Sequence, residues 1–390
     1  MTNIKGNQAK LIQAISNEKL WKFFIDNKDI LMLPIEVDQS ADVFKVLYSR
    51  WDKYYKLVEN TIWLSESLPI IKNYGDTLKD VANSYFSGDI INASNTIKNL
   101  LEKISNSSQG CYLEDNYIDS ESLHWFRART SNYTPLTSSD MKHIPFNKRS
   151  IISNQRYSIN GIPCLYLGSS AFVCWEELNR PTPDTLWINR YMQNQSYNSV
   201  FKILNLSTTA YMLCNYETYI NNKFERTKFI KDFFEMWILQ SACSIIVKEQ
   251  NRTFLAEYVI PQLVMQNIKS VDIDGVMYFS VKMRNTYLDP SGWIARNLAI
   301  PAFDEQDGKL YSTKIDNIFM ISEPINVGMF NSDIITPTTL IIDPNFNFAR
   351  TNALVHISDE ISNSYRNTIF CRVEVELLNR LFNKKSNKSV

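Results

Sequence analysis

The sequence has few of the residues on which metal sites and phosphate loops depend. Its six cysteines (positions 111, 164, 174, 214, 243 and 371) form no C-x-x-C pair, and its three histidines are scattered along the chain. A zinc site is therefore not expected, and the thiols are typical of a reducing cytoplasm. The ten glycines include no G-x-G-x-x-G and no G-x-x-x-x-G-K pattern, and no G-x-S-x-G elbow occurs. Rossmann, P-loop and α/β-hydrolase chemistry are thereby excluded.

An excess of positive charge and a long apolar run are missing too. Lys plus Arg and Asp plus Glu both total 41, so the net charge is zero and general binding of nucleic acid is not expected. The N-terminus has no apolar signal core. The longest apolar stretch, Met236 to Val247, is interrupted by Gln240 and Ser241 and is too short to span a bilayer. We expect a soluble cytoplasmic protein without a membrane partner.

The first hundred residues are predicted to be helical. Asp42 to Ser65 carries apolar residues at helical spacing, Ile62 among them, and a second helical pair, Thr77 to Phe86 and Asp89 to Ile104, is broken at Ser87-Gly88. Large aromatic side chains in such stripes are most simply packing residues. The stripes could equally serve self-association or the capture of a partner, and the sequence does not choose between these roles.

Three parts are expected in the 390 residues. The polar segment Ser105 to Gly110 is the best candidate for a linker. It separates a helical N-terminal domain (residues 1–110, regulatory or assembly) from a catalytic domain (residues 111–335). A C-terminal extension (residues 336–390) ends in an amphipathic helix.

After the linker, short strands and helices follow one another without a regular alternation, which predicts an α+β fold rather than a doubly wound sheet. Helices are expected at Lys223 to Val247 and Arg372 to Lys385, and strands at Val200 to Leu206, Gly275 to Ser280, Asn297 to Phe303 and Ile318 to Ile325. Trp125 to Arg129 alternates apolar and basic residues as a half-buried strand does, so Arg127 and Arg129 share a face. Two such arginines are more often in surface salt bridges, although a diphosphate would fit both guanidinium forks.

The stretch from Gln155 to Leu178 combines the chemically most suggestive residues. A basic-aromatic pair, Arg156 and Tyr157, precedes a short apolar strand, and a serine N-cap then opens a helix that carries Glu176 and Glu177. The other residues of this helix are almost all apolar. At least one of the two carboxylates is therefore expected to point into a cleft, where an acid near an arginine is a candidate for function.

The order of these blocks resembles the RES domain. The blocks are Arg127-x-Arg129, Asp140-Met with Pro145, Arg156, Gly161-Ile-Pro-x-Leu-Tyr-Leu, Glu177, Ile260-Pro-Gln262 and Gly275-x-x-Tyr-x-Ser280. Together they span Leu123 to Phe330, about half the chain. RES proteins are bacterial toxins, usually paired with an antitoxin. The resemblance implies split antiparallel sheets like those of ADP-ribosyltransferases, and cleavage of NAD at its nicotinamide–ribose bond.

Site residues follow from this resemblance by position. Arg127, Tyr166, Glu177 and Ser280 correspond to the catalytic residues, and Arg129, Arg156 and Tyr157 are expected to bind NAD. Two departures from the family pattern are Gln155, where a glycine is usual before the arginine, and Ser158, where an asparagine is common. The resemblance implies no cofactor and no metal, since NAD is the substrate.

These residue types suit the chemistry. Nicotinamide leaves as a neutral molecule while positive charge develops on the ribose, which a carboxylate stabilises. A tyrosine can stack on the nicotinamide ring, and arginines can hold the pyrophosphate. A serine hydroxyl can bond the carboxamide or a ribose oxygen. Glu177 is favoured over Glu176 because it follows Tyr166 by eleven residues, the separation that the resemblance implies.

Several functions and partners stay open at this point. Family members pass ADP-ribose to water, to inorganic phosphate or to a protein, so a mono-ADP-ribosyltransferase with a macromolecular target is one alternative. A catalytically inert interaction protein that binds through its helical domain is another. Besides NAD, the candidate partners are phosphate, an antitoxin or regulatory protein, and a second copy of the chain.

Overall fold

The computed structural model describes residues 10–107, 113–115, 125–194, 196, 201–215, 223–248, 252–283, 287–330, 353–357 and 362–386. The chain divides into two compact units. Unit 1 consists of Met1–Asp115, Asn154–Ile159 and Lys202–Val276, and unit 2 of Asn116–Ser153, Asn160–Phe201 and Met277–Val390. Both units mix helices with strands whose pairing is mainly antiparallel, which confirms the predicted α+β class.

This grouping differs from the predicted boundaries at residues 110 and 335. The N-terminal helices share unit 1 with residues 154–159 and 202–276, and the C-terminal segment belongs to unit 2. The reason lies in α9 (Lys223–Cys243), which packs on α4 (Val43–Glu59) and α5 (Leu68–Phe86) of the N-terminal segment. Cutting the chain near residue 110 would therefore remove the helices against which α9 is buried.

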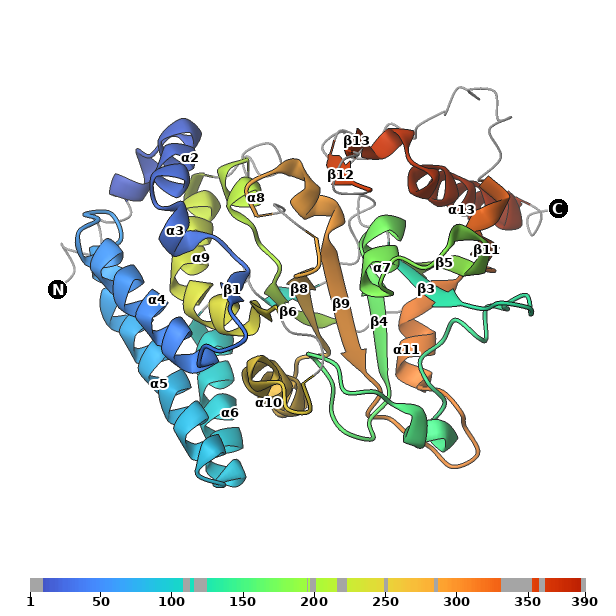
Figure 1. The fold of residues 1–390 in the computed structure, drawn as a ribbon, viewed down its shortest axis with the longest axis horizontal. Helices are drawn as coiled ribbons and strands as arrows, with labels where there is room; N and C mark the ends of the chain where they lie inside the picture. The colour runs from blue at the N-terminus through green and yellow to red at the C-terminus, as the bar shows by residue number, and fades with distance from the viewer. Residues whose placement is uncertain are drawn as a thin grey trace. The chain divides into compact units, whose positions relative to one another are not determined.

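Unit 1 is built mainly of helices, with α4, α5 and α6 lying side by side as its longest N-terminal elements (Figure 1). Its helices are α2 (Asn17–Asp26), α3 (Lys28–Leu31), α4, α5, α6 (Ile90–Ser107), α8 (Ala210–Cys214), α9 and α10 (Val259–Asn267), and its 3-10 helices are η1 (Ser65–Ser67), η6 (Ala256–Tyr258) and η7 (Ile268–Val271). The predicted helices of the first hundred residues and the break before Ile90 are confirmed.

The helix α4 shows how the sequence pattern is used. Asp42 caps its N-terminus by accepting from the amides of Phe44 and Lys45 at 2.9 and 3.1 Å. Its predicted apolar stripe is buried, with Trp51 at its centre fully so. One member of the predicted stripe is wrong: the helix ends at Glu59, and Ile62 lies beyond it with 76% of its surface exposed.

The second half of α9, from Met236 onward, is completely buried, which distinguishes it from the amphipathic helices that cover it. Its polar groups are bonded inside the unit: Ser241 Oγ accepts from Trp51 Nε1 at 2.9 Å, and Gln240 Nε2 donates to the carbonyls of Leu206 and Thr208. The residues that interrupt the apolar run of the sequence are thus satisfied in the core. The predicted helix continued to Val247, but the chain leaves the helix at Cys243.

The strands of unit 1 are short. β1 (Ile35–Val37) pairs in parallel with β7 (Ile245–Val247), and β2 (Leu113–Asp115) pairs antiparallel with β6 (Lys202–Leu206). On its other side β6 neighbours β8 (Gly275–Phe279), inside which the boundary between the units falls. The predicted strands at Val200 to Leu206 and Gly275 to Ser280 are confirmed as β6 and β8.

Unit 2 contains an antiparallel sheet with the strand order β10–β5–β3–β4–β9, and β11 also pairs with β5. The strands are β3 (Trp125–Thr130), β4 (Cys164–Gly168), β5 (Leu186–Gln193), β9 (Arg296–Pro301), β10 (Phe319–Ile321) and β11 (Ile325–Asn326), with the separate hairpin β12 (Leu354–His356) and β13 (Ser362–Ser364). The predicted strand at Ile318 to Ile325 is divided into β10 and β11.

The longest strand of unit 2, β5, is absent from the sequence predictions. It carries Asn189 and Arg190 in its middle, and both are buried. The side chain of Asn189 donates to the carbonyl of Ser322, and the amide of Arg190 donates to Ser322 Oγ at 2.9 Å. Buried polar residues obscure the alternation by which a strand is recognised, and their partner lies 132 residues further along the chain.

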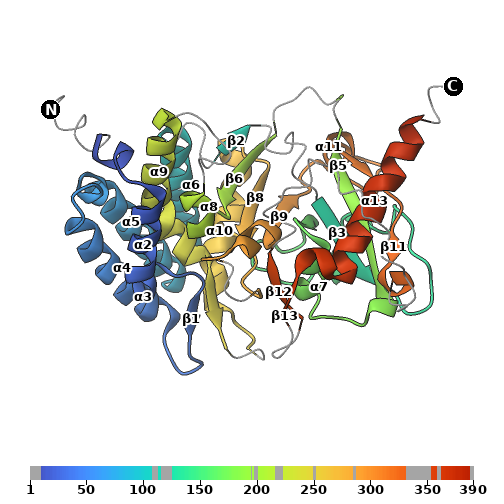
Figure 2. The same ribbon diagram turned by 90° about the horizontal axis from the view of Figure 1, so that it is seen from above.

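Helices cover this sheet and complete the core of unit 2. They are α7 (Ala171–Glu177), α11 (Thr313–Ile318) and α13 (Ile369–Ser386), with 3-10 helices η3 (Phe146–Ile151), η4 (Pro183–Thr185), η8 (Pro290–Ile294), η9 (Val327–Phe330) and η10 (Tyr365–Asn367). Figure 2 shows α13 beside α7, and α13 also packs on β5. Among the helices of the described ranges, none combines the length and apolar character that crossing a bilayer requires.

Candidate active site

The helix that carries the two glutamates is held tightly from its start. Ser170 is its N-cap, as predicted, and Ser170 Oγ accepts from the amide of Val173 at 3.0 Å. Gly168 at the end of β4 lets the helix approach the strand closely, because a Cβ there would lie 2.6 Å from both Cys174 Sγ and Val173 Cγ1. α7 therefore rests directly on the sheet.

A Schellman turn ends α7 immediately after Glu177. The amide of Arg180 donates to the carbonyl of Trp175, and the amide of Asn179 donates to the carbonyl of Glu176, both at 3.0 Å. Asn179 and Arg180 adopt left-handed conformations, with φ of 61° and 57°. This conformation suits asparagine and strains arginine, so the turn must be held by contacts of its side chains.

Glu176 makes one of these contacts, an ion pair with Arg180, and its side chain is buried. Arg180 binds the carboxylate through two nitrogens, with Nε to Oε2 at 3.0 Å and Nη2 to Oε1 at 2.8 Å. Burial raises the pKa of Glu176, and the bonds and charge of Arg180 oppose that rise. Glu176 is 5% exposed and fully engaged, which leaves it no free face for a ligand.

Glu177 is arranged differently, with one carboxylate oxygen held by two hydrogen bonds and the side chain partly exposed. Ser280 Oγ donates to Glu177 Oε1 at 2.7 Å, and Asn297 Nδ2 donates to the same oxygen at 2.6 Å. Both donors are buried, whereas the Glu177 side chain keeps 34% of its surface exposed. The structure thus brings together two residues singled out in the sequence, Glu177 and Ser280, which lie 103 positions apart.

Lys282 makes further contacts with Glu177 and with the turn that follows it. Its ammonium donates to the carbonyl of Glu177 at 2.7 Å and to Asn179 Oδ1 at 2.9 Å, and it lies 3.8 Å from Glu177 Oε2. Its backbone amide donates to Ser280 Oγ at 3.2 Å, so the hydroxyl proton of Ser280 is directed to the carboxylate. The site therefore holds the Glu177 side chain in place through donors on Ser280, Asn297 and Lys282.

Arg127 and Tyr166 meet where two strands diverge. β3 pairs with β4 only at Phe126 and Gly168, whereas it pairs with β5 along its whole length. Beyond that pair the two strands are connected by a side chain instead of backbone hydrogen bonds: Arg127 Nη1 donates to the carbonyl of Tyr166 at 3.1 Å. Burial, with contributions from Cys164 and from Tyr278, raises the pKa of Tyr166. Its phenol is therefore neutral near pH 7 and half-buried.

Arg127 and Arg129 bring two positive charges together, with the Asp140 carboxylate near enough to act electrostatically on Arg129. Arg129 Nη2 donates to the carbonyl of Lys142 at 2.7 Å, and in the part of the chain that the structure describes neither arginine forms an ion pair. Burial lowers the pKa of Arg129 to about 10, and the positive charge of Arg127 adds to this effect. Arg129 is therefore protonated at neutral pH. The Nε of each arginine is buried without an acceptor among the described residues.

Arg156 and Tyr157 belong to unit 1, whereas Glu177 belongs to unit 2. The guanidinium of Arg156 donates to the backbone carbonyls of Cys243, Ile245 and Glu257 at 3.3, 2.7 and 3.5 Å, and it lies over the Tyr258 ring at 4.9 Å. Tyr157 is completely buried. These contacts are structural, and binding of NAD stays a prediction for both residues.

One curated protein resembles nearly the whole chain. The putative toxin YopC of Bacillus subtilis (strain 168) is 30% identical over 383 residues, which cover 94% of this chain and 81% of that protein. The chain belongs to the YopC family.

In the comparison with models of protein families, no model matches the chain. The crystal structure of the M. tuberculosis MbcT-MbcA toxin-antitoxin complex contains a chain that aligns with 57% of this one and 91% of its own length, at 11% identity. Its TM-score of 0.27 is too low to support an argument about the fold.

Two residues of the site in this member of the YopC family were not predicted from the sequence. Asn297 belongs to the predicted strand after Pro290, but nothing in that strand marks its amide as a partner of Glu177. Lys282 follows Ser280 by two positions and could have been noticed from that spacing. The pairing of β4 with β9 places Asn297 opposite Gly168, at the base of α7, and this pairing is tertiary information.

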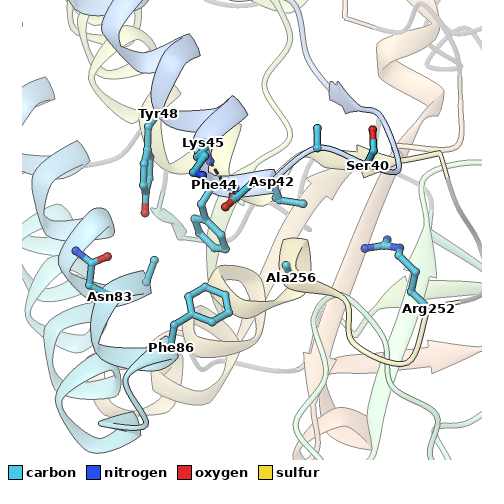
Figure 3. A pocket seen from close by; sticks show the side chains of 12 residues that line it. Ser40, Asp42, Phe44, Lys45, Tyr48, Asn83, Phe86, Arg252 and Ala256 are labelled. Carbon is cyan, nitrogen blue, oxygen red and sulfur yellow. Dashed lines mark hydrogen bonds between the residues drawn. The ribbon is translucent and has the colours of Figure 1, made fainter.

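A pocket of about 680 Å³ in unit 1 is a separate feature (Figure 3). Phe44 and Phe86 form part of its wall, and Asp42 and Arg252 lie at its polar edge. Asp42 already caps α4, and Arg252 binds Glu257 through both terminal nitrogens. None of the residues predicted to form the active site lines this pocket, so it is not part of the candidate site.

His143 of unit 2 is expected to make the protein less stable in mild acid. It is buried; its Nδ1 donates to the carbonyl of Ile144 and its Nε2 accepts from the amide of Ser312 at 2.9 Å, an arrangement that holds the neutral ring. Burial lowers its pKa, Arg127 lowers it further, and the Ile144 bond opposes the shift. Because the unfolded chain takes up a proton near pH 6.5 while the folded one does not, stability should fall as the pH drops below about 6.5.

Thermal unfolding at pH 7.5 and pH 5.5 measures this effect. His143→Gln should be less stable than the wild type at both values, but it should lose less stability between them. Equal losses in the two proteins would show that His143 does not cause the acid sensitivity.

Proposed function

We propose that the protein is a RES-type enzyme that cleaves NAD at the nicotinamide–ribose bond and acts as a toxin by depleting NAD. The observation that carries this proposal is the anchoring of Glu177. Two buried donors, Ser280 and Asn297, hold Oε1, while Oε2 lies 3.8 Å from the Lys282 ammonium on a side chain that keeps 34% of its surface exposed. Such an arrangement is suited to stabilise a cation that forms during a reaction, because the carboxylate needs no reorganisation.

The proposed reaction requires few groups from the protein. The bond between the ribose carbon C1′ and the pyridinium nitrogen breaks, and its electron pair stays with nicotinamide, which leaves as a neutral molecule. Positive charge then spreads over C1′ and the ring oxygen of the ribose, and Glu177 Oε2 faces this charge. An acceptor, water in the simplest case, adds to C1′ and loses its proton.

Arg127 and Arg129 support the same proposal from the substrate's other end. Both guanidinium groups carry donors without an acceptor, and neither has a carboxylate partner in the described residues. The salt bridges that would have explained two arginines on one strand face are thus not formed there. A pyrophosphate supplies the missing acceptors and charge, and it would fix the ribose relative to Glu177.

Tyr166 completes the proposed substrate site. Its phenol is neutral and its ring half-buried on the strand next to α7. A tyrosine ring at this place can stack on the nicotinamide, which favours the orientation in which C1′ meets the carboxylate. The role of toxin rests on the name of the related protein from B. subtilis, and an inhibiting partner protein is a prediction that follows from the same family resemblance.

Release of nicotinamide from NAD tests the proposal directly. Purified full-length protein is incubated with NAD in the presence and absence of inorganic phosphate, and the products are separated by chromatography. Free ADP-ribose indicates hydrolysis, a phosphorylated ADP-ribose that appears only with phosphate indicates phosphorolysis, and label retained on protein indicates transfer. Absence of nicotinamide in both incubations, from a folded protein at high concentration, would contradict the proposed function.

A further inference from the structure

The C-terminal helix α13 places a completely buried carboxylate at the start of α7. Glu374 has no exposed surface, and its Oε1 accepts from the amide of Ala171 at 2.6 Å and from the Tyr365 hydroxyl at 2.5 Å. Ala171 is the first residue of α7, so its amide is one of the groups that a helix leaves unpaired.

Aromatic packing strengthens the connection between the two helices. Phe370 of α13 lies 5.4 Å from Phe172 and 5.1 Å from Trp175, measured between ring centroids, and both partners belong to α7. On its other side α7 rests against Gly168, where no side chain separates helix and strand. α7 is thus clamped between α13 and β4, with Glu374 bonded to its first residue.

The length of α7 makes this contact relevant to Glu177. The helix has seven residues, so its two ends are separated by about 9 Å at the usual rise per residue. Over two turns an α-helix behaves as a rigid rod, and a shift of its first residue along the axis moves its last residue equally. Glu177 is that last residue, and its partners Ser280 and Asn297 belong to the end of β8 and to β9 rather than to α7.

We propose that Glu374 is a positioning residue: its bond to the start of α7 sets the place of Glu177 against Ser280 and Asn297. The inference rests on the proposed function, since it assigns Glu374 a role through Glu177. It also gives the C-terminal segment a defined task. Without Glu374, the amide of Ala171 and the Tyr365 hydroxyl would be buried with no acceptor from α13, and α7 would settle in another position.

A double-mutant cycle tests this role. Glu374→Leu should lower kcat for nicotinamide release by about 30- to 100-fold and change the KM for NAD by less than about 3-fold, since a small misplacement reduces rate more than binding. In the Glu177→Gln background the same substitution should have almost no further effect on kcat. Glu374→Gln keeps an acceptor oxygen and should stay within about tenfold of the wild type. Equal losses in both backgrounds, or a rise in KM alone, would overturn the proposal.

Hydrogen exchange of the α7 amides gives a readout that does not need activity. In Glu374→Leu these amides should exchange faster than in the wild type, while those of β5 stay protected. Glu376→Leu, on the same helix, is the matched control and should leave both kcat and exchange unchanged. If Glu374→Leu does not fold, Tyr365→Phe should show the same changes at smaller size.

These measurements distinguish a failure of the proposed NAD cleavage from a failure of the positioning role of Glu374. A wild type that releases no nicotinamide contradicts the proposed function, and exchange of α7 still decides whether Glu374 holds the helix. Unchanged α7 exchange in a folded Glu374 or Tyr365 variant would refute the positioning role, whatever the activity of the wild type.

Discussion

Glu177→Gln is expected to lower the rate of nicotinamide release on the order of 10²–10³-fold at saturating NAD, as when a preorganised stabilising group is removed. Glutamine keeps the shape of the side chain, and its oxygen can still accept from Ser280 and Asn297. The substitution therefore removes the negative charge near the ribose with little change in geometry. A rate within threefold of the wild type would show that Glu177 does not stabilise the transition state.

Glu176→Gln is the matched control for this result, since it makes the same chemical change at the neighbouring position. It should reduce the rate by less than about tenfold, because the carboxylate of Glu176 is turned to Arg180. Thermal stability should fall instead, because the ion pair that holds the left-handed turn is lost. A reversed ranking of the two variants would move the catalytic role to Glu176.

Arg127→Ala should weaken the use of NAD strongly while changing stability little. A charge-assisted contact with pyrophosphate contributes on the order of 1.5–3 kcal/mol, which corresponds to a loss of about 10- to 150-fold in kcat/KM. Among the residues that the structure describes, Arg127 makes one hydrogen bond, to the carbonyl of Tyr166. Steady-state kinetics together with thermal unfolding measure both quantities.

Arg156→Ala is compared with Arg127→Ala in the same two measurements. The resemblance to the RES domain assigns both arginines to NAD, and on that basis neither loss should affect folding. In the structure, however, Arg156 joins three backbone carbonyls of unit 1. We expect a clear drop in thermal stability and a smaller kinetic effect than for Arg127→Ala. A stable Arg156 variant with a strong loss of kcat/KM would return Arg156 to the substrate site.

The sequence by itself determined the local structure that carries the site. Apolar residues at helical spacing, with Asp42 and Ser170 as caps, define α4 and α7, because a helix depends on its own side-chain periodicity and on the satisfaction of its first amides. The class α+β also follows from the order of short elements. The sequence further singled out Glu177 and Ser280, and their proximity in the structure agrees with that choice.

Tertiary structure alone decided which residues surround these two. Asn297 reaches Glu177 only because β9 pairs with β4, and Glu374 reaches α7 only because α13 folds back on the unit. Pairings over such separations leave no local pattern, since any of several strands could satisfy the same hydrogen bonds.

The grouping of the chain into units is decided in the same way. β5 escaped prediction because its buried Asn189 and Arg190 look like residues of a loop, and Ser322, far along the chain, accepts from the Asn189 side chain and from the Arg190 backbone amide. The N-terminal helices belong with α9 because its almost wholly apolar second half must be covered, and the sequence does not show which segment covers it. Burial is a property of the whole fold, so only the fold could assign it.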